Sequence, residues 1–339
     1  MTKTIGVGVV GIGAIGKLHA ENYVSKVPGA RLAGIADVNL PAANELASRL
    51  GVSAVYADYH QLLNDPSVDA IVVATPPFLK KDITLAAADR HKHVFCEKPM
   101  TLSLKEADEM ISAVRRSGIA FQVGYQKRSD VSFMRAKSEI AEGRVGKILL
   151  IRAHNRDPPT TVAGWSADPK RSGSVFLDTC SHDFDALRYL SGSEVTRVSA
   201  DGNAMMYEEL RKNGDYDTVV VNLRLASGAM AQVDACGYTP YGFDSGSEVV
   251  GTGGGIIIGM GEKTFTHLYG KEGMSNERHD YWGSRWAQAY RDEMAAFVSC
   301  INEGGVPRAT IQDGRAAMEI GLAAWNSVKS GAPVGLPLS

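Results

Sequence analysis

Short apolar runs alternate with helix-like stretches along the first 124 residues of the chain. Helical patterns near residues 15–27, 41–50, 79–90 and 103–117 separate the runs. The apolar runs are Ile5–Val10, Arg31–Ala36, Asp69–Ala74, His93–Cys96 and Ile119–Gly124. Continuous apolar runs joined by helices are typical of strands buried on both faces of a sheet. This part of the chain therefore predicts an α/β fold with a doubly wound parallel sheet.

The pattern changes after residue 125. A helix near 130–142 and a strand near 146–154 precede a Pro-rich loop, and a helix is expected near 179–190. Several strand-like runs then follow without helices between them: Val195–Gly202, Thr218–Leu225, Ala229–Cys236, Glu248–Gly251, Ile256–Gly259 and Thr264–His267. Helical patterns near 285–303 and 312–329 follow these runs. We therefore expect two domains, 1–125 and 126–339, the second an α+β domain with a largely antiparallel sheet.

Composition narrows the range of partners. The 339 residues are 44% hydrophobic and 22% charged with a net charge of -2, so no basic field attracts nucleic acid or anionic lipid. No apolar stretch approaches the roughly 18 uninterrupted residues of a membrane span. The four cysteines form no CxxC pair, which argues against a structural metal and is typical of a reducing compartment. We expect a cytoplasmic protein with a small-molecule partner and no metal.

A glycine motif follows the first apolar run at once. Ile5–Val10 leads into Gly11-Ile-Gly-Ala-Ile-Gly16, where a helical pattern begins. Gly11 permits the tight turn, Gly13 allows the backbone to approach a pyrophosphate, and Gly16 allows close packing of helix on strand. The N–H groups of Ala14, Ile15 and their neighbours at the helix N-terminus attract phosphate. The first domain is therefore predicted to be a Rossmann dinucleotide-binding domain.

Asp37 selects the dinucleotide. It ends the second apolar run, about 20 residues after Gly16, where an acidic side chain accepts hydrogen bonds from a ribose hydroxyl. A 2′-phosphate would face this carboxylate, and Val38, Asn39 and Leu40 offer no compensating cation. We predict NAD as the cofactor, with Val38 beside it. The alternative is that Asp37 only caps the helix that starts near Pro41.

Two further segments follow predicted strands. Thr75-Pro76-Pro77 and Glu97-Lys98-Pro99 each stand at a carboxyl end, where ligands of open α/β sheets bind. We expect both segments to border the nicotinamide half of the cofactor. Taken alone, Pro76-Pro77 is equally consistent with an ordinary turn, and Lys98 with a solvated surface lysine.

Together, these motifs resemble the Gfo/Idh/MocA oxidoreductase family over essentially the whole chain. The most specific short motif is Glu97-Lys98-Pro99. Further segments resemble the inositol 2-dehydrogenases and related sugar or polyol dehydrogenases of that family: Arg156-Asp157-Pro158, Ser172-Gly173, Leu177–Asp185, Gln288–Glu293 and Asp313-Gly314-Arg315.

The resemblance implies a catalytic trio of Lys98, Asp178 and His182. A neutral imidazole is suited to accept the hydroxyl proton, and a lysine cation to stabilise the developing alkoxide. Asp178 is then expected to bind a substrate hydroxyl or to orient the other two. On a helix, residues 178 and 182 share one face. The alternatives are a metal bound by Asp178, His182 and Asp185, and a histidine on a helix surface.

A polyol substrate needs many polar partners, and several polar side chains lie in suitable loops or at strand ends. The predicted substrate contacts, besides the trio itself, are Arg128, Asn155, Asp157, Tyr238 and Tyr281.

The predicted activity is NAD-dependent oxidation of a ring secondary alcohol, with myo-inositol to its 2-keto product as the leading reaction. Alternatives are scyllo-inositol, or an aldose oxidised at carbon 1. Two other classes of function are open: an NAD-recycling glycoside hydrolase and a redox-silent sugar sensor. The open face of an antiparallel sheet predicts a homodimer or homotetramer.

Overall fold

The computed structural model describes residues 3–259 and 261–338 of the chain. The chain divides into two compact units. Unit 1 comprises Met1–Ser129 and Gln288–Arg315, and unit 2 comprises Asp130–Ala287 and Ala316–Ser339.

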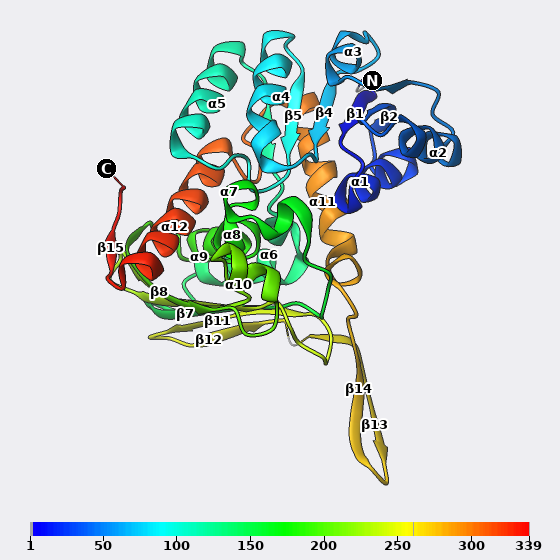
Figure 1. Cartoon of the computed structure of the whole chain (residues 1–339). Helices are drawn as coiled ribbons and strands as arrows, with labels where there is room; N and C mark the ends of the chain where they lie inside the picture. The colour runs from blue at the N-terminus through cyan, green and yellow to red at the C-terminus, as the bar shows by residue number, and fades with distance from the viewer. Residues whose placement is uncertain (1–2, 260, 339) are drawn as a thin grey trace. The chain divides into compact units, whose positions relative to one another are not determined.

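Unit 1 contains the predicted doubly wound sheet (Figure 1). Its strands are parallel and follow the order β3-β2-β1-β4-β5-β6. They are β1 (Ile5–Val10), β2 (Ala30–Ala36), β3 (Val55–Tyr56), β4 (Ala70–Val73), β5 (His93–Cys96) and β6 (Phe121–Val123). The central strands β1 and β4 are buried along their whole length, as their continuous apolar sequences predict. The strand order reverses between β1 and β4, and ligands of such sheets bind at this switch point.

The helices of unit 1 pack on this sheet. They are α1 (Ala14–Ser25), α2 (Leu40–Leu50), α3 (Tyr59–Asn64), α4 (Pro77–Asp89) and α5 (Leu104–Ser117), followed by the 3-10 turn η1 (Gln126–Ser129). Their ends follow ordinary capping chemistry: Ser103 accepts from the Glu106 N–H at the start of α5, and Gly118 (φ +69°) ends that helix.

The two compact units differ from the predicted domains in one segment. The sequence interpretation assigned all of 126–339 to the second domain, whereas Gln288–Arg315 belongs to unit 1. The reason lies in α11 (Trp282–Glu303), whose side chains Met294, Phe297 and Val298 are buried in the same core as β1 and α1. An apolar stripe on a helix indicates burial but does not identify the sheet against which the helix packs.

Unit 2 contains a seven-stranded sheet of order β12-β11-β7-β10-β9-β8-β15. Its strands are β7 (Ile148–Arg156), β8 (Val195–Asn203), β9 (Thr218–Leu225), β10 (Met230–Cys236), β11 (Asp244–Gly251), β12 (Gly255–Ile258) and β15 (Val334–Gly335). All pairs are antiparallel except β7 with β10, which is parallel. Burial alternates along β9 and β10, so one face is buried and the other is polar and open.

Figure 1 shows α6 (Val131–Ala141) and α9 (Ser181–Ser191) on the buried face of that sheet. The remaining helices are the 3-10 turn η2 (Gly164–Ala167), α7 (Pro169–Ser172), α8 (Ser174–Asp178), α10 (Glu208–Asn213) and α12 (Ile311–Ser330). A separate hairpin of β13 (Glu262–Gly270) and β14 (Gly273–Arg278) projects from unit 2. Over residues 3–259 and 261–338, no helix combines the length and apolarity needed to cross a membrane.

Candidate active site

The glycine turn between β1 and α1 has the geometry that a pyrophosphate needs. Gly11 has φ +88°, and a Cβ there would lie 3.0 Å from the Ala74 backbone. A Cβ on Gly16 would lie 1.9 Å from the Gly11 carbonyl oxygen, so only glycine allows the helix this close to the turn. A Cβ on Gly13 would meet nothing within 4 Å. The space beside Gly13, at the N-terminus of α1, is where a dinucleotide phosphate fits.

Asp37 is fixed against this turn. Its Oδ2 accepts from the Ile12 N–H at 2.8 Å, and its Oδ1 accepts from the Asn39 N–H at 2.8 Å. Asn39, not Asp37, caps α2, because its side chain accepts from the Ala42 N–H. The carboxylate keeps lone pairs for a ribose hydroxyl. Val38 beside it is 92% exposed and offers no cation, so the residues present fit NAD.

The Thr75-Pro76-Pro77 segment forms the turn from β4 into α4. Pro77 is the first helical residue and Pro76 the cap. The Thr75 hydroxyl is shielded from solvent and, within the described part of the chain, has no hydrogen-bond partner. A buried hydroxyl in this state is suited to bond a ligand or a water molecule. It lies beside Gly11, since a Cβ there would be 3.0 Å from Thr75 Cγ2.

Glu97 directs its carboxylate into unit 1. The residue is 5% exposed, and its Oε1 lies 2.7 Å from Nε2 of buried His19. Burial raises the pKa of Glu97, but the hydrogen bond and charge of His19 outweigh burial and leave this pKa below its usual value. We therefore leave the Glu97 carboxylate out of the proposed cofactor contacts. Lys98, the next residue, is half-buried.

A second buried acid lies near Glu97. Glu293 on α11 is 1% exposed, and neither of its carboxyl oxygens has a hydrogen-bond partner among the residues that the structure describes. Burial and the charge of Glu97 raise the pKa of Glu293 well above its usual value. Burial and the neighbouring carboxylate thus both favour the protonated form of Glu293.

Asp178 and His182 belong to unit 2, but they do not lie on one helix. Asp178 is the exposed last residue of α8, and His182 is the second residue of α9. Thr179 and Cys180 keep helical dihedrals between the two helices. Asp178 and His182 therefore stand on two successive helices and not on one, and the expectation that their side chains share a face stays a prediction.

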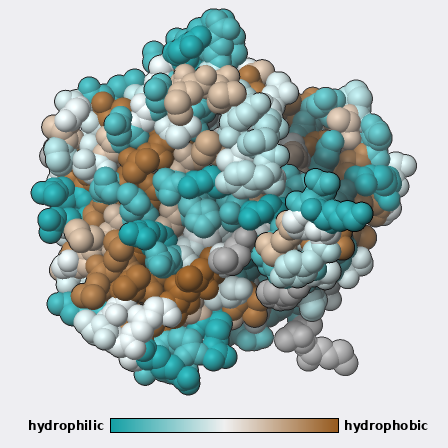
Figure 2. Space-filling model, turned by 90° about the horizontal axis from the view of Figure 1, so that it is seen from below, coloured by the Kyte–Doolittle hydropathy of each residue, from teal (hydrophilic) through white to brown (hydrophobic). Residues whose placement is uncertain are grey.

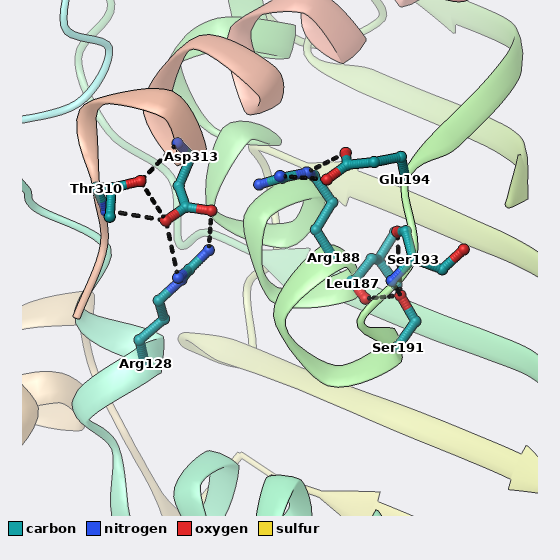
Figure 3. Close-up of polar contacts among 8 residues, drawn as sticks. All are labelled: Arg128, Leu187, Arg188, Ser191, Ser193, Glu194, Thr310 and Asp313. Carbon is teal, nitrogen blue, oxygen red and sulfur yellow. Dashed lines mark hydrogen bonds and ion pairs between the residues drawn. The ribbon is translucent and has the colours of Figure 1, made fainter. Parts of the chain in front are cut away.

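The far end of α9 is tied down by polar contacts (Figure 3). Arg188 forms a bidentate ion pair with Glu194 at 2.7 and 2.6 Å. The Ser191 hydroxyl donates to the Leu187 carbonyl at 2.7 Å and accepts from the Ser193 N–H at 3.2 Å. These bonds fix the C-terminal turn of the helix that carries His182.

Asp215 anchors the segment that carries Asp178. It is 4% exposed, and its Oδ1 accepts from the backbone N–H groups of Tyr216 (2.9 Å) and Val175 (3.4 Å), the latter in α8. Burial raises the pKa of Asp215 to about 6, with a further contribution from the charge of Asp178 and opposing ones from the two N–H groups and Lys329. Unit 2 therefore holds a titratable acid close to Asp178.

Arg128 has partners within unit 1 (Figure 3). Its guanidinium contacts Asp313 at 2.9 and 3.1 Å and the Arg308 carbonyl at 2.8 Å. Although burial raises the pKa of Asp313, the charge of Arg128 and hydrogen bonds from Arg128 and Thr310 hold it at about 2. We assign Arg128 to anchoring the start of α12 and leave it out of the proposed substrate contacts.

Three of the other predicted contacts lie near one another in unit 2. Asn155 pairs with Ala235 in the parallel β7–β10 ladder, and the Asp157 N–H donates to the Cys236 carbonyl at 2.9 Å. Tyr238 follows two residues later and is 37% exposed. The Oδ1 of Asn155 is buried and has no partner in the described ranges. Tyr281 is 48% exposed and directly precedes α11.

The alternative of a metal site needs a cluster of ligand side chains. Over residues 3–259 and 261–338, no three His, Cys, Asp or Glu side chains gather in a group that could hold a metal ion. Asp178 is exposed at the end of α8, whereas Asp185 is fully buried in α9.

Sequence reasoning missed four buried polar residues that surround the predicted ones: His19, Lys80, Asp215 and Glu293. For His19 in α1, Lys80 in α4 and Glu293 in α11, the signal was a charged or polar residue at a helix position that the apolar pattern assigns to the core. Asp215 lies between α10 and β9 and had no such signal.

Two family models match the sequence. Residues 5–125 match the Gfo/Idh/MocA oxidoreductase family with an NAD-binding Rossmann fold, and residues 133–257 match a Gfo/Idh/MocA C-terminal domain.

Individual relatives match over almost the full chain. The sequence is 36% identical over 324 residues to a myo-inositol 2-dehydrogenase from Thermotoga maritima, covering 95% of this chain and 96% of the relative. It is 34% identical over 336 residues to a scyllo-inositol 2-dehydrogenase (NAD(+)) from Bacillus subtilis, covering 99% and 97%. The crystal structure of a Lactobacillus casei scyllo-inositol dehydrogenase with bound NAD(H) and scyllo-inositol matches with a TM-score of 0.92 at 29% identity, covering 98% and 99%.

Proposed function

The chain belongs to the Gfo/Idh/MocA oxidoreductase family, and from that membership we propose that it oxidises a ring hydroxyl of an inositol with NAD as the hydride acceptor. The leading substrate is myo-inositol, which would yield the 2-keto inositol. The second candidate is scyllo-inositol, because one full-length relative is named for it.

The observation that carries the proposal is the Asp37 carboxylate fixed at the glycine turn, in a chain of which 95% matches a myo-inositol 2-dehydrogenase. The turn provides space for a pyrophosphate at Gly13, and Asp37 provides a ribose acceptor with no nearby cation for a 2′-phosphate. When bound, NAD accepts the hydride that leaves the substrate carbon.

We assign the acid–base chemistry to Lys98, Asp178 and His182. Neutral His182 accepts the hydroxyl proton at an imidazole nitrogen. The Lys98 ammonium donates a hydrogen bond to the same oxygen and stabilises its developing negative charge. Asp178 accepts a hydrogen bond from a substrate hydroxyl or orients the other two side chains.

Substrate orientation is assigned to the polar side chains at the ends of β7 and β10. We assign contacts with ring hydroxyls to Asn155, Asp157 and Tyr238. The buried Oδ1 of Asn155 is an acceptor without a donor among the described residues. Tyr281 is kept as a further contact from the segment before α11.

The proposal is tested by following NADH formation with purified chain, NAD and a panel of inositols and aldoses. We expect turnover with myo-inositol or scyllo-inositol and much less with aldoses. An NAD-recycling glycoside hydrolase would release sugar from a glycoside without net NADH. A sugar sensor would bind inositol and leave NAD unchanged. Absence of NADH with every inositol would refute the proposal.

We also propose that the chain assembles as a homodimer or homotetramer through the open face of the seven-stranded sheet. Exposed apolar side chains interrupt its polar surface at Val220, Met230, Val250 and Ile257. Figure 2 views the molecule from below and shows hydrophobic patches among hydrophilic ones. Apolar groups so exposed favour burial against a second copy.

A cytoplasmic location is part of the same proposal. None of the four cysteines, all of which lie in the described ranges, forms a disulfide, and two of them, Cys96 and Cys180, are buried. Buried thiols that form no disulfide are typical of proteins in a reducing compartment.

A further inference from the structure

A lysine is buried directly behind the Glu97–Pro99 turn. Lys80 lies in α4 and is 2% exposed, although a lysine side chain carries a charge that is rarely buried without partners. Its neighbour Lys81 lies on the accessible side of the same helix and pairs with Glu109 at 3.4 Å. The two lysines therefore have different tasks.

The Lys80 ammonium bonds three consecutive backbone carbonyls. Its Nζ donates to the oxygen of Glu97 at 2.6 Å, of Lys98 at 3.1 Å and of Pro99 at 3.0 Å. An ammonium has three N–H donors, whereas a neutral amine has two and a lone pair that a carbonyl oxygen repels. Three carbonyl acceptors therefore require the charged form.

The carbonyls need this partner because the chain leaves the sheet at this point. The last ladder bonds run from the Glu97 N–H to the Val73 carbonyl (3.0 Å) and from the Gly124 N–H to the Cys96 carbonyl (2.9 Å). Glu97 and Pro99 are buried beyond this point, and buried carbonyl groups without a partner are costly. Lys80 supplies the hydrogen-bond donors that a neighbouring strand would otherwise provide.

The Glu97 side chain gives the turn a second anchor, through its bond to His19 in α1. The backbone is thus held from α4 and the preceding side chain from α1. Lys98, between the anchored residues, is half-buried, so its position is fixed while its side chain remains accessible.

We propose that Lys80 is a positioning residue for Lys98: its buried ammonium holds the three carbonyls around Lys98 and so fixes the point from which that side chain extends. This inference rests on the proposed function, in which Lys98 stabilises the alkoxide. It makes Lys80 a determinant of turnover that touches neither substrate nor cofactor.

Replacing Lys80 tests its positioning role, and the same replacement at the neighbouring Lys81 is the matched control. Lys80→Met keeps most of the side-chain volume and removes all three donors. Since a displacement of about 1 Å can cost about 100-fold in rate, we expect kcat with the best inositol to fall about 100-fold. NADH affinity should stay within about threefold, because the glycine turn and Asp37 are untouched. Lys81→Met should behave as wild type. A kcat for Lys80→Met within about threefold of wild type would overturn the proposal.

A double-mutant cycle separates positioning from general stabilisation. If Lys80 acts through Lys98, its removal from a Lys98→Met protein should cost less than about threefold more in kcat. If Lys80 only stabilised the fold, Lys80→Met would lower kcat by the same factor in the Lys98→Met protein as in wild type. This result would refute the proposal. If Lys80→Met does not accumulate as folded protein, Lys80→Arg replaces it. A guanidinium cannot direct three donors onto these carbonyls from the same position, so we still expect at least a tenfold fall; wild-type kcat would count against the proposal.

Hydrogen exchange tests the same contact without any substrate. In Lys80→Met or Lys80→Arg we expect the amides of Glu97, Lys98, Met100 and Thr101 to exchange at least about tenfold faster, while those of β1 are unchanged. Unchanged exchange at these amides would refute the positioning role. If the wild-type chain oxidises no inositol, the proposed function fails, while this measurement still decides whether Lys80 holds the turn.

Discussion

At the scale of single residues, we propose that Asp37 selects NAD over NADP. It is oriented by the N–H groups of Ile12 and Asn39, and no cation lies at residues 38–40. The double substitution Asp37→Ser with Val38→Arg removes the anion and adds a cation for a 2′-phosphate. We expect the ratio of kcat/KM for NAD to that for NADP to fall at least about 100-fold, measured as initial rates with each cofactor. Asp89→Ser, an exposed aspartate at the end of α4, is the charge control. An unchanged ratio in the double variant would mean that Asp37 does not select NAD.

Lys98 is the residue whose loss should affect chemistry most. Lys98→Met removes the cation that is assigned to the alkoxide and keeps the length of the side chain. We expect kcat to fall about 100-fold or more, while the NADH dissociation constant, measured by fluorescence titration, changes little. Turnover equal to wild type would remove Lys98 from the mechanism.

The sequence predicted the residues of the cofactor motif better than the buried polar residues around the predicted site. Gly11, Gly16 and Asp37 follow a fixed spacing, so local sequence was enough to predict their geometry. His19, Lys80 and Glu293 act on residues distant in sequence, and no periodicity predicts which buried polar side chain meets which partner. For Arg128, a polar residue in a loop was interpreted as a substrate contact, whereas its bonds to Asp313 and Arg308 became visible only in the fold.

At the scale of elements, the β1–α1 turn needs glycine for two different reasons. Gly16 allows α1 to pack closely on the turn, and Gly13 leaves space for a phosphate. Gly16→Ala would place a Cβ 1.9 Å from the Gly11 carbonyl oxygen, so the helix must shift. We expect it to lower the free energy of unfolding by about 1–3 kcal/mol. Gly13→Ala meets no atom within 4 Å and should melt as wild type, but bind NADH at least about tenfold more weakly. Thermal melting and NADH titration of both variants check this. A Gly13→Ala protein with normal affinity would mean that no phosphate approaches Gly13.

Asp215 makes the anchoring of α8 dependent on pH. Its pKa is raised from the usual 3.8 to about 6 in the folded chain, so the folded state holds this proton more tightly than the unfolded state does. Its stabilising contribution is therefore complete below about pH 4 and is lost as pH rises to about 6.

Asp215→Asn has no proton to lose. Relative to wild type, it should gain stability on the order of 2 kcal/mol between about pH 4 and pH 7. Paired denaturation curves at the two pH values measure this difference. Asp201→Asn, at an exposed position of β8, controls for removal of one negative charge. A difference between Asp215→Asn and wild type that does not change with pH would contradict the assignment.

The length of an element decided how well the sequence predicted it. Long or strongly apolar segments were located closely, and β1, β5 and β9 have the bounds that were predicted. The two residues of β3, the five of α8 and the two of β15 are too few to show a period, and they were missed. The interruption between α8 and α9 was also missed. Neither Thr179 nor Cys180 is a helix-breaking residue such as glycine or proline, so the sequence gives no sign of it.

At the scale of the whole molecule, the doubly wound parallel sheet of unit 1 was predicted from the sequence, although β3 was missed, and the sheet of unit 2 was predicted only in part. Strands that alternate with helices pair in parallel through right-handed crossovers, which limits the topologies that unit 1 can adopt. The parallel pairing of β7 with β10 joins strands about 80 residues apart, and no local signal specifies it. Likewise, the apolar stripe of α11 did not reveal that its later residues pack in unit 1.

Assembly is the prediction that belongs to the whole molecule. Light scattering after size exclusion should give two or four times the 36.2 kDa of one chain. Met230→Glu with Ile257→Glu places charge on the open face of the seven-stranded sheet, and we expect it to reduce the mass of the assembly. Val306→Glu, also at an exposed apolar residue but in the loop after α11, should leave the mass unchanged. A wild-type protein that elutes as a monomer would contradict the assembly proposal.

The central claim is hydride transfer from an inositol ring carbon to NAD, and isotope transfer tests it most directly. Purified chain is incubated with NAD and myo-inositol, or scyllo-inositol, deuterated at the carbon to be oxidised, and the NADH formed is analysed by mass spectrometry. We predict that each NADH carries one deuterium and that an equal amount of keto-inositol appears. Formation of NADH without deuterium, or no NADH from either inositol, would contradict it.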